Sequence, residues 1–189
     1  QRDISYAVDL GRHPVPRVAL TLSYSNHSGP GSPGCEPQWL NRGTDYSELK
    51  NACYWNYFRV YTPQGSRLLS NTPLPLSKHT VSVEIGRGTP GHDTSRVSSS
   101  HNKTVFSGLT SIEAGARRDI ALVYDLPGSV IGREGDTITY RLLVQKQPGV
   151  RQRGVSVTVT PPEGYSLTAS SLPANVTEAG IASIDFVLG

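Results

Sequence analysis

Apolar and polar residues alternate one by one along several stretches of the chain. The alternation is clearest over residues 18–24, 138–144 and 155–160, where every second position is Val, Ile, Leu or Tyr. Because a β-strand points successive side chains to opposite sides, this pattern predicts strands with one buried and one wet face. Further strands are predicted over residues 2–10, 54–62, 79–86, 103–110, 118–125, 165–170 and 181–188.

The spacing of these strands predicts the fold class. They recur about every ten residues, with turns rich in Gly and Pro between them, and the only helix we expect is a turn or two over residues 45–52. Antiparallel sheets have this organisation, whereas βαβ units need long helices between strands. We therefore predict an all-β, antiparallel β-sandwich, immunoglobulin-like or jelly-roll-like, with about ten to twelve strands.

The length of the chain is compatible with one domain. A weak boundary near residues 148–154 would separate the C-terminal strands, but about four strands alone would bury little apolar surface. We therefore expect a single β-sandwich domain over residues 1–189. The chain has no Met and its first strand starts almost at once, so we expect a fragment of a longer protein.

The two cysteines, Cys35 and Cys53, are not arranged as a metal or redox motif, because no CxxC pair is present. We predict that they form one structural disulfide, which would close a Gly-, Pro- and Ser-rich loop over residues 26–52. A bond across a loop of this length stabilises a fold by roughly 3 kcal/mol in the chain-entropy model. Such bonds persist outside the cytosol, so we expect an extracytoplasmic protein.

Charge does not indicate a nucleic-acid partner. The formal net charge is +3, from 18 Lys and Arg against 15 Asp and Glu, and it is spread along the chain. Its densest groups are not interleaved with aromatic residues, as single-strand binding surfaces are, so we expect no nucleic-acid partner. No apolar run approaches the roughly 18 residues of a membrane helix, so membrane contact is expected only through an anchor outside this sequence.

One aromatic-rich segment is the strongest candidate for recognition. Alternation within a strand would divide its residues between one face with Trp55, Tyr57 and Arg59 and another with Tyr54, Phe58 and Val60. Together with Trp39, the first face would offer a flat aromatic patch for sugar rings. A central strand buried on both faces also explains the scarcity of charge in this segment, and we favour that interpretation.

A second polar candidate follows the strand predicted over residues 138–144. Gln145, Lys146 and Gln147 run into Pro148 and Gly149. They could form a recognition edge for a glycan or a partner peptide, but the interpretation that we favour is a strand end terminated by Pro148. The possible recognition surface therefore comprises Trp39, Trp55, Tyr57, Lys146 and Gln147.

Catalytic and metal-binding motifs are not apparent in the sequence. His92, Asp93 and His101 share a long loop predicted over residues 86–102, and could be joined by His79, but the spacing is not that of a zinc site. There is no Gly-x-Ser-x-Gly elbow, and nothing singles out a pair of carboxylates. We therefore predict no catalytic residue, cofactor or metal.

Two segments carry a resemblance to a known family. Residues 51–69 read NACYWNYFRVYTPQGSRLL and residues 140–149 read YRLLVQKQPG. They resemble the C-terminal extracytoplasmic region of the DUF4012 family, bacterial membrane-anchored proteins of unknown function, in which an aromatic strand follows a cysteine and a QKQPG strand comes later. The resemblance extends over about residues 1–160 and implies a part exposed outside the membrane. It implies no catalytic residues, because none are established for the family.

We therefore expect a non-catalytic extracytoplasmic module for cell-surface structure, assembly or recognition. Its partners would be a second copy, bound through sheet edges, or an envelope glycan. The alternative is a carbohydrate-binding or accessory domain of an envelope polysaccharide enzyme, with a site in the 86–102 loop.

Overall fold

The computed structural model describes residues 2–28, 53–76, 88–145 and 153–188. In these ranges the chain forms twelve strands and one short 3-10 turn, which confirms the all-β prediction. The helix predicted over residues 45–52 and the strand predicted over 79–86 lie outside the described residues.

The described elements occur in the following order along the chain. They are β1 (Arg2–Asp9), β2 (Arg17–Ser25), β3 (Tyr54–Pro63), β4 (Arg67–Asn71), β5 (Arg96–Ser100), β6 (Lys103–Ile112), β7 (Arg117–Asp125), η2 (Gly128–Val130), β8 (Ile131–Glu134), β9 (Thr137–Tyr140), β10 (Arg153–Thr160), β11 (Asn175–Val176) and β12 (Ala182–Leu188).

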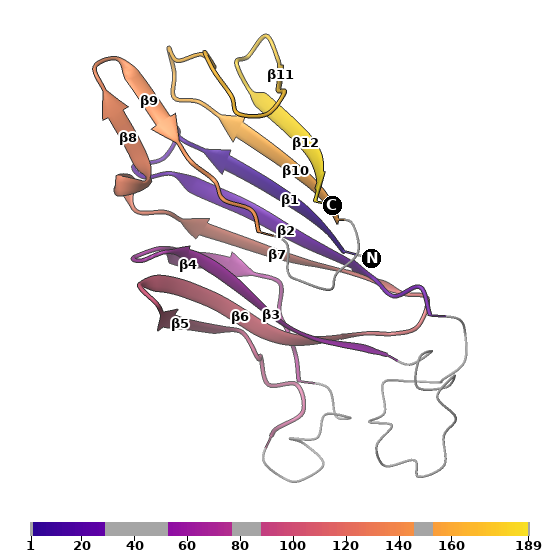
Figure 1. The fold of residues 1–189 in the computed structure, drawn as a ribbon. Helices are drawn as coiled ribbons and strands as arrows, with labels where there is room; N and C mark the ends of the chain where they lie inside the picture. Colours follow the sequence, from indigo (N-terminus) through magenta and orange to yellow (C-terminus); the bar gives the residue numbers. More distant parts are fainter. Residues whose placement is uncertain (1, 29–52, 77–87, 146–152, 189) are drawn as a thin grey trace.

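Seven strands form the larger sheet, in the order β11-β12-β10-β1-β2-β7-β4 (Figure 1). All its pairs are antiparallel except one, because β1 and β10 run parallel from Asp3↔Gly154 to Asp9↔Thr160. The amide of Gly154 also donates a 3.3 Å hydrogen bond to Asp3 Oδ1, 151 residues earlier. The predicted antiparallel pairing therefore has one exception, at the centre of the sheet.

Three strands form a second sheet, in the order β3-β6-β5, and β8 and β9 form a separate hairpin. Strands β5 and β6 are joined by His101 and Asn102, whose φ angles are 50° and 56°. Two successive positive φ values are typical of the type I′ turn, whose twist matches that of the flanking strands. This turn lets β5 pair with β6 over its whole length.

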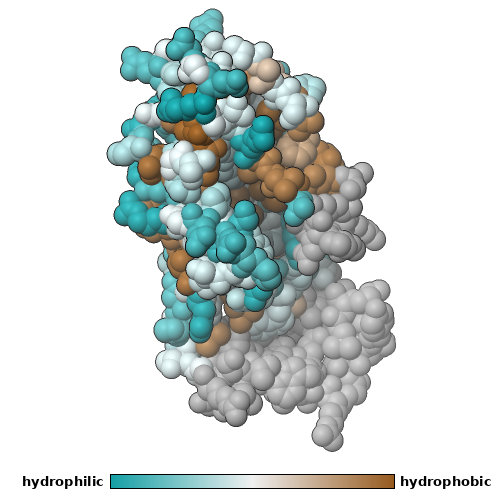
Figure 2. All heavy atoms as spheres, turned by 60° about the vertical axis from the view of Figure 1, so that its left-hand side comes forward, coloured by the Kyte–Doolittle hydropathy of each residue, from teal (hydrophilic) through white to brown (hydrophobic). Residues whose placement is uncertain are grey.

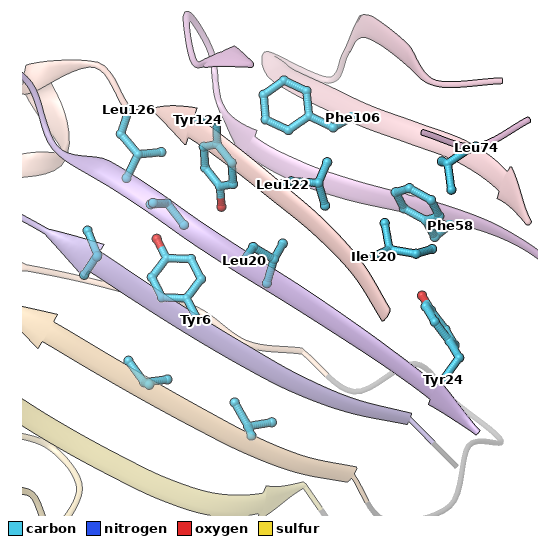
Figure 3. Packing of buried hydrophobic residues seen from close by; sticks show 14 of the residues in the cluster. Tyr6, Leu20, Tyr24, Phe58, Leu74, Phe106, Ile120, Leu122, Tyr124 and Leu126 are labelled. Carbon is cyan, nitrogen blue, oxygen red and sulfur yellow. The ribbon is translucent and has the colours of Figure 1, made fainter. Parts of the chain in front are cut away.

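The core collects apolar side chains from both the larger and the three-stranded sheet (Figure 3). Phe106 of β6 meets Tyr124 of β7 with ring centroids 5.2 Å apart, and both residues are almost fully buried. Close packing excludes a side chain at Gly108, because a Cβ there would lie 2.3 Å from Leu74 Cδ1 and 3.2 Å from the Phe58 ring. The two sheets therefore share one tightly packed interior.

A tyrosine cluster connects the β8–β9 hairpin to the larger sheet. The hydroxyls of Tyr6 in β1 and Tyr140 at the end of β9 lie 2.5 Å apart. Tyr124 of β7 adds its hydroxyl to the same cluster, and burial raises the pKa of all three phenols. The cluster places the end of β9 against β1.

Several strand predictions are confirmed by the structure. They are those over residues 2–10, 18–24, 54–62, 103–110, 118–125, 155–160 and 181–188, which correspond to β1, β2, β3, β6, β7, β10 and β12. In each of these strands the described residues find a partner strand along most of the predicted length.

Three other predictions are wrong in whole or in part. Residues 165–170 form no strand, and their side chains are exposed. The strand predicted over 138–144 ends at Tyr140, because its partner β8 begins at Ile131, which pairs with Tyr140. The loop predicted over 86–102 contains β5, which the turn at Asn102 folds back onto β6.

Candidate recognition face

The aromatic strand β3 has one buried and one exposed face. Asn56 and Phe58 are 7% and 6% exposed, whereas Tyr57 and Tyr61 are 52% and 54% exposed and Trp55 is partly exposed. The predicted division of the strand is thus confirmed. The interpretation that we favoured, burial on both faces, is wrong, because only one face of β3 packs onto the core.

The exposed side of β3 continues across β6 and β5. Residues directly opposite each other in an antiparallel pair share a face, so the register defines its members. The outer face comprises Trp55, Tyr57, Arg59 and Tyr61 of β3, Lys103, Val105, Ser107, Leu109 and Ser111 of β6, and Arg96, Ser98 and Ser100 of β5.

Tyr57 is held in the middle of the outer face. Its hydroxyl donates a 3.1 Å hydrogen bond to Ser107 Oγ on the neighbouring strand. Arg59 Cζ lies 5.3 Å from the centroid of the Tyr57 ring, within cation–π range. The Ser107 hydroxyl, followed by Arg59 and the charge of Arg96, holds the pKa of Tyr57 below its usual value. The phenol is therefore oriented by partners on three strands.

Arg59 lies between the two exposed tyrosines along β3. The hydroxyls of Tyr61 and Tyr57 raise its pKa further above the ordinary value for arginine. The guanidinium therefore stays charged at any physiological pH, and it is fixed beside aromatic rings on a strand rather than on a loop.

The outer face carries positive charge without acidic neighbours. Its charged members are Arg59, Arg96 and Lys103, and none of the residues that the register assigns to it is Asp or Glu. The ion pairs within the described ranges use other arginines, namely Arg12, Arg17, Arg67 and Arg117. Arg59 and Arg96 form no ion pair with any described residue.

The residues of the outer face combine three kinds of contact. The exposed tyrosine rings offer flat apolar surface, the serine and tyrosine hydroxyls offer hydrogen bonds, and the arginines offer charge. Val105 is only 3% exposed although it belongs to this face, which shows how closely the large side chains cover the sheet. Such a surface suits a polar ligand that has flat apolar patches.

The predicted recognition residues are only partly within the described ranges. Trp55 and Tyr57 lie together on the outer face, as alternation indicates. Trp39, Lys146 and Gln147 lie outside the described residues, and so does Cys35. Cys53 directly precedes β3, and its disulfide with Cys35 stays a prediction.

Arg96 and Tyr61 were missing from the predicted surface. Tyr61 lies on the same face of β3 as Tyr57, four residues further along the strand. Extending the alternation by four residues therefore assigns it to the same surface. Arg96 was not predicted as a surface residue, because the sequence predicts a loop over residues 86–102 and no strand there. The signal for β5 was Asn102, a residue type that tolerates the positive φ of a hairpin turn.

Within the described part of the 86–102 segment, the candidate residues of the alternative site make local contacts. Asp93 Oδ1 accepts hydrogen bonds from the amides of Ser95 at 2.9 Å and Leu74 at 3.3 Å, and these bonds lower its pKa. His101 Nδ1 lies 2.8 Å from Ser100 Oγ in the β5–β6 turn. No three His, Cys, Asp or Glu side chains among the described residues could hold a metal together.

Comparison with known proteins assigns no family to the chain. No protein-family model matches it, and neither does any curated protein. The resemblance to the DUF4012 family therefore stays an expectation. None of the described helices is long and apolar enough to cross a membrane.

Proposed function

We propose that this chain is a non-catalytic, extracytoplasmic β-sandwich module that recognises cell-surface carbohydrate through the outer face of β3, β6 and β5. The observation that carries the proposal is the exposure of Tyr57 and Tyr61, each more than half exposed, on a strand whose other face is buried. Exposed aromatic residues gathered on one face indicate a binding surface more often than an inert one.

Carbohydrate fits this surface because sugar rings have apolar C–H faces and hydroxyl rims. The rings of Tyr57 and Tyr61 can stack against the former, while Ser98 and Ser111 can bond the latter. The two tyrosines are four positions apart, roughly 13 Å along the strand, so each would hold a different ring of a chain. A polysaccharide therefore fits better than a single sugar.

Three further features of the proposal rest on sequence and core packing. Two sheets with a common interior support a sandwich. The resemblance to a membrane-anchored family and the predicted disulfide support an extracytoplasmic location. A Cys35–Cys53 bond would tie the 26–52 segment to the start of β3, and the intact mass before and after reduction and alkylation tests for it.

The test of carbohydrate binding compares three tyrosine variants. A glycan array of the full chain first identifies bound polysaccharides, and titration of the intrinsic tryptophan fluorescence then measures affinity. Tyr57→Ala and Tyr61→Ala should each weaken binding about tenfold, because each removes a stacking ring. Tyr165→Ala is the matched control, since Tyr165 is also exposed but lies outside the outer face.

Two results would contradict carbohydrate recognition by this face. One is an array without any bound glycan, and the other is equal loss of affinity in all three variants. Circular dichroism of each variant establishes that the fold is retained before affinities are compared.

A second candidate function, self-association, is favoured by one feature of the larger sheet. Strand β11 pairs with β12 only at Ala182 and Ser183, so residues 184–188 have no partner on that side within the described ranges. Val187 is 59% exposed there. Figure 2 shows that apolar side chains also reach the surface among hydrophilic ones in the upper half of the molecule. An open strand with apolar side chains can add a strand from another chain.

A further inference from the structure

Among the described residues, two sets of three facing residues have an arginine on each outer strand and differ in the residue on the middle strand. We use the term rung for three residues that lie directly opposite one another on three neighbouring strands. In the larger sheet Arg17 of β2, Asp125 of β7 and Arg67 of β4 form a rung. In the three-stranded sheet Arg59 of β3, Ser107 of β6 and Arg96 of β5 form another.

The first rung shows how a carboxylate is held between two arginines from flanking strands. Arg17 Nε donates to Asp125 Oδ1 and Arg67 Nη2 donates to Asp125 Oδ2, both at 2.8 Å. Each arginine uses its own carboxylate oxygen, and the Asp125 side chain is only 8% exposed. This rung satisfies its charges within the protein.

The second rung also has an arginine on each flanking strand, but its central residue is not a carboxylate. Its central residue is Ser107, whose short side chain is buried beneath the larger ones and accepts the hydrogen bond of Tyr57. Arg59 and Arg96 therefore flank a neutral hydroxyl, and neither has an acidic partner in the described part of the chain. Arg59 and Arg96 belong to strands roughly 10 Å apart across β6, and two like charges on one face favour an anion between them.

We propose that the Arg59–Ser107–Arg96 rung binds the carboxylate of an acidic polysaccharide, in the position that the Asp125 carboxylate has between Arg17 and Arg67. This inference rests on the proposed function and names its class of ligand. The tyrosines on either side of Arg59 then stack the sugar rings that flank the charged one.

The composition of the outer face favours an acidic glycan over a nucleic acid. Arg59 stands between Tyr57 and Tyr61, so charge and stacking alternate along β3 as uronic-acid and neutral rings alternate in many acidic polysaccharides. The remaining polar members are mostly serines, which bond sugar hydroxyls readily. A phosphate on every nucleotide would call for more basic residues than the three on this face.

The experiment compares acidic polysaccharides with their neutral counterparts. Hyaluronan, alginate and polygalacturonate are titrated against the full chain, each beside a carboxyl-reduced form in which the carboxylate has become a hydroxymethyl group. We expect at least one acidic polymer to bind at least tenfold more tightly than its reduced form. Its binding should weaken as salt is raised from about 0.05 to 0.5 M.

Four variants then locate the effect. Arg59→Gln and Arg96→Gln should each reduce affinity for the acidic polymer about tenfold while leaving affinity for the reduced form within about threefold. Ser107→Asp supplies the missing carboxylate internally and should reduce acidic-polymer binding by more than tenfold. Ser107→Asn, of similar size to Ser107→Asp but neutral, is its matched control and should keep the preference for the acidic over the reduced polymer that Ser107→Asp loses.

The outcomes separate this inference from the proposed function. Equal affinity for acidic and reduced polymers, with loss in Tyr57→Ala, overturns the charge inference and leaves carbohydrate recognition intact. Absence of binding to every glycan overturns both. Tighter binding of single-stranded oligonucleotide than of any acidic polymer also overturns the inference. If Ser107→Asp does not fold, the two arginine variants decide.

Discussion

Asp125 illustrates how a single residue sets the charge state of its surroundings. The hydrogen bond from Arg17 has the largest effect on this carboxyl, and together with the bond and charge of Arg67 it holds the pKa below its usual value although burial opposes them. A carboxyl with a depressed pKa in the folded chain stabilises the fold above its unfolded pKa near 3.9. That stabilisation is lost as pH falls from there through the folded pKa.

Replacing this carboxylate should therefore be costly. We predict that Asp125→Asn lowers the free energy of unfolding by about 2 kcal/mol at pH 7, because it removes two charge-assisted hydrogen bonds from a nearly buried site. The difference from the parent chain should shrink as pH falls below about 4. Urea unfolding at pH 7 and at pH 3 measures both effects.

Asp119 on the same strand provides the control. It pairs with Arg117 at 3.1 Å, but both side chains are more than half exposed. Exposed ion pairs contribute about 0–1 kcal/mol, so Asp119→Asn should have a much smaller effect. Similar losses in the two variants would contradict the assignment of Asp125 as the structural carboxylate.

The strands of this fold could be predicted where the alternation of apolar and polar residues coincides with pairing to a neighbouring strand. The buried position of Phe58 and the outward position of Tyr57 follow from the period of a strand alone. Whether a further layer covers the outward face depends on segments distant in sequence, which alternation cannot reveal. For this reason the sequence alone favoured burial of both faces of β3, whereas one of its faces is exposed in the structure.

Strands fail to form where a partner is missing. Residues 165–170 contain Tyr165 and Leu167 at alternate positions, but no described strand lies alongside them, and both side chains stay exposed. Conversely, β5 has the unpromising sequence RVSSS and forms because the turn at His101 and Asn102 brings it onto β6. Local propensity is a weak guide in both cases, since a strand depends on its neighbours.

The tyrosine cluster gives the attachment of the β8–β9 hairpin a testable pH dependence. Burial raises the pKa values of Tyr6, Tyr124 and Tyr140. Above about pH 10 the unfolded chain loses phenol protons that the folded chain keeps. The free energy of unfolding should therefore fall with rising pH, by about 1.4 kcal/mol per pH unit for each such tyrosine.

Tyr6→Phe isolates this contribution. The variant should lose about 1 kcal/mol at pH 8, from the hydrogen bond with Tyr140, and should show a shallower decline between about pH 10 and 11. Urea unfolding across this range measures the slopes, with Tyr165→Phe as the exposed control. Parallel slopes for the parent chain and Tyr6→Phe would argue against a buried, protonated cluster.

At the scale of the whole molecule, the open side of β12 bears on oligomeric state. If this edge adds a strand from a second copy, light-scattering chromatography should show species that grow with concentration, with and without reductant. Val187→Lys should suppress them, because a charge on an edge strand opposes pairing. Val97→Lys on β5, at an equally exposed valine, should leave them unchanged.

The chromatography also ranks the two candidate functions. A monomer of the parent chain at every concentration would exclude self-association through β12 and leave carbohydrate recognition. Suppression by Val97→Lys instead of Val187→Lys would move the contact to the edge of the three-stranded sheet, next to Arg96.

The parallel pairing of β1 with β10 has a consequence while the chain is being synthesised. On the ribosome β1 is synthesised before its neighbour β10, which lies 151 residues later. At about 5 to 20 residues per second, one edge of β1 waits roughly 8 to 30 seconds for its partner. During that interval β1 lacks the strand that covers this edge in the folded sheet, so a chain interrupted after β9 would present the backbone groups of a central strand to its surroundings.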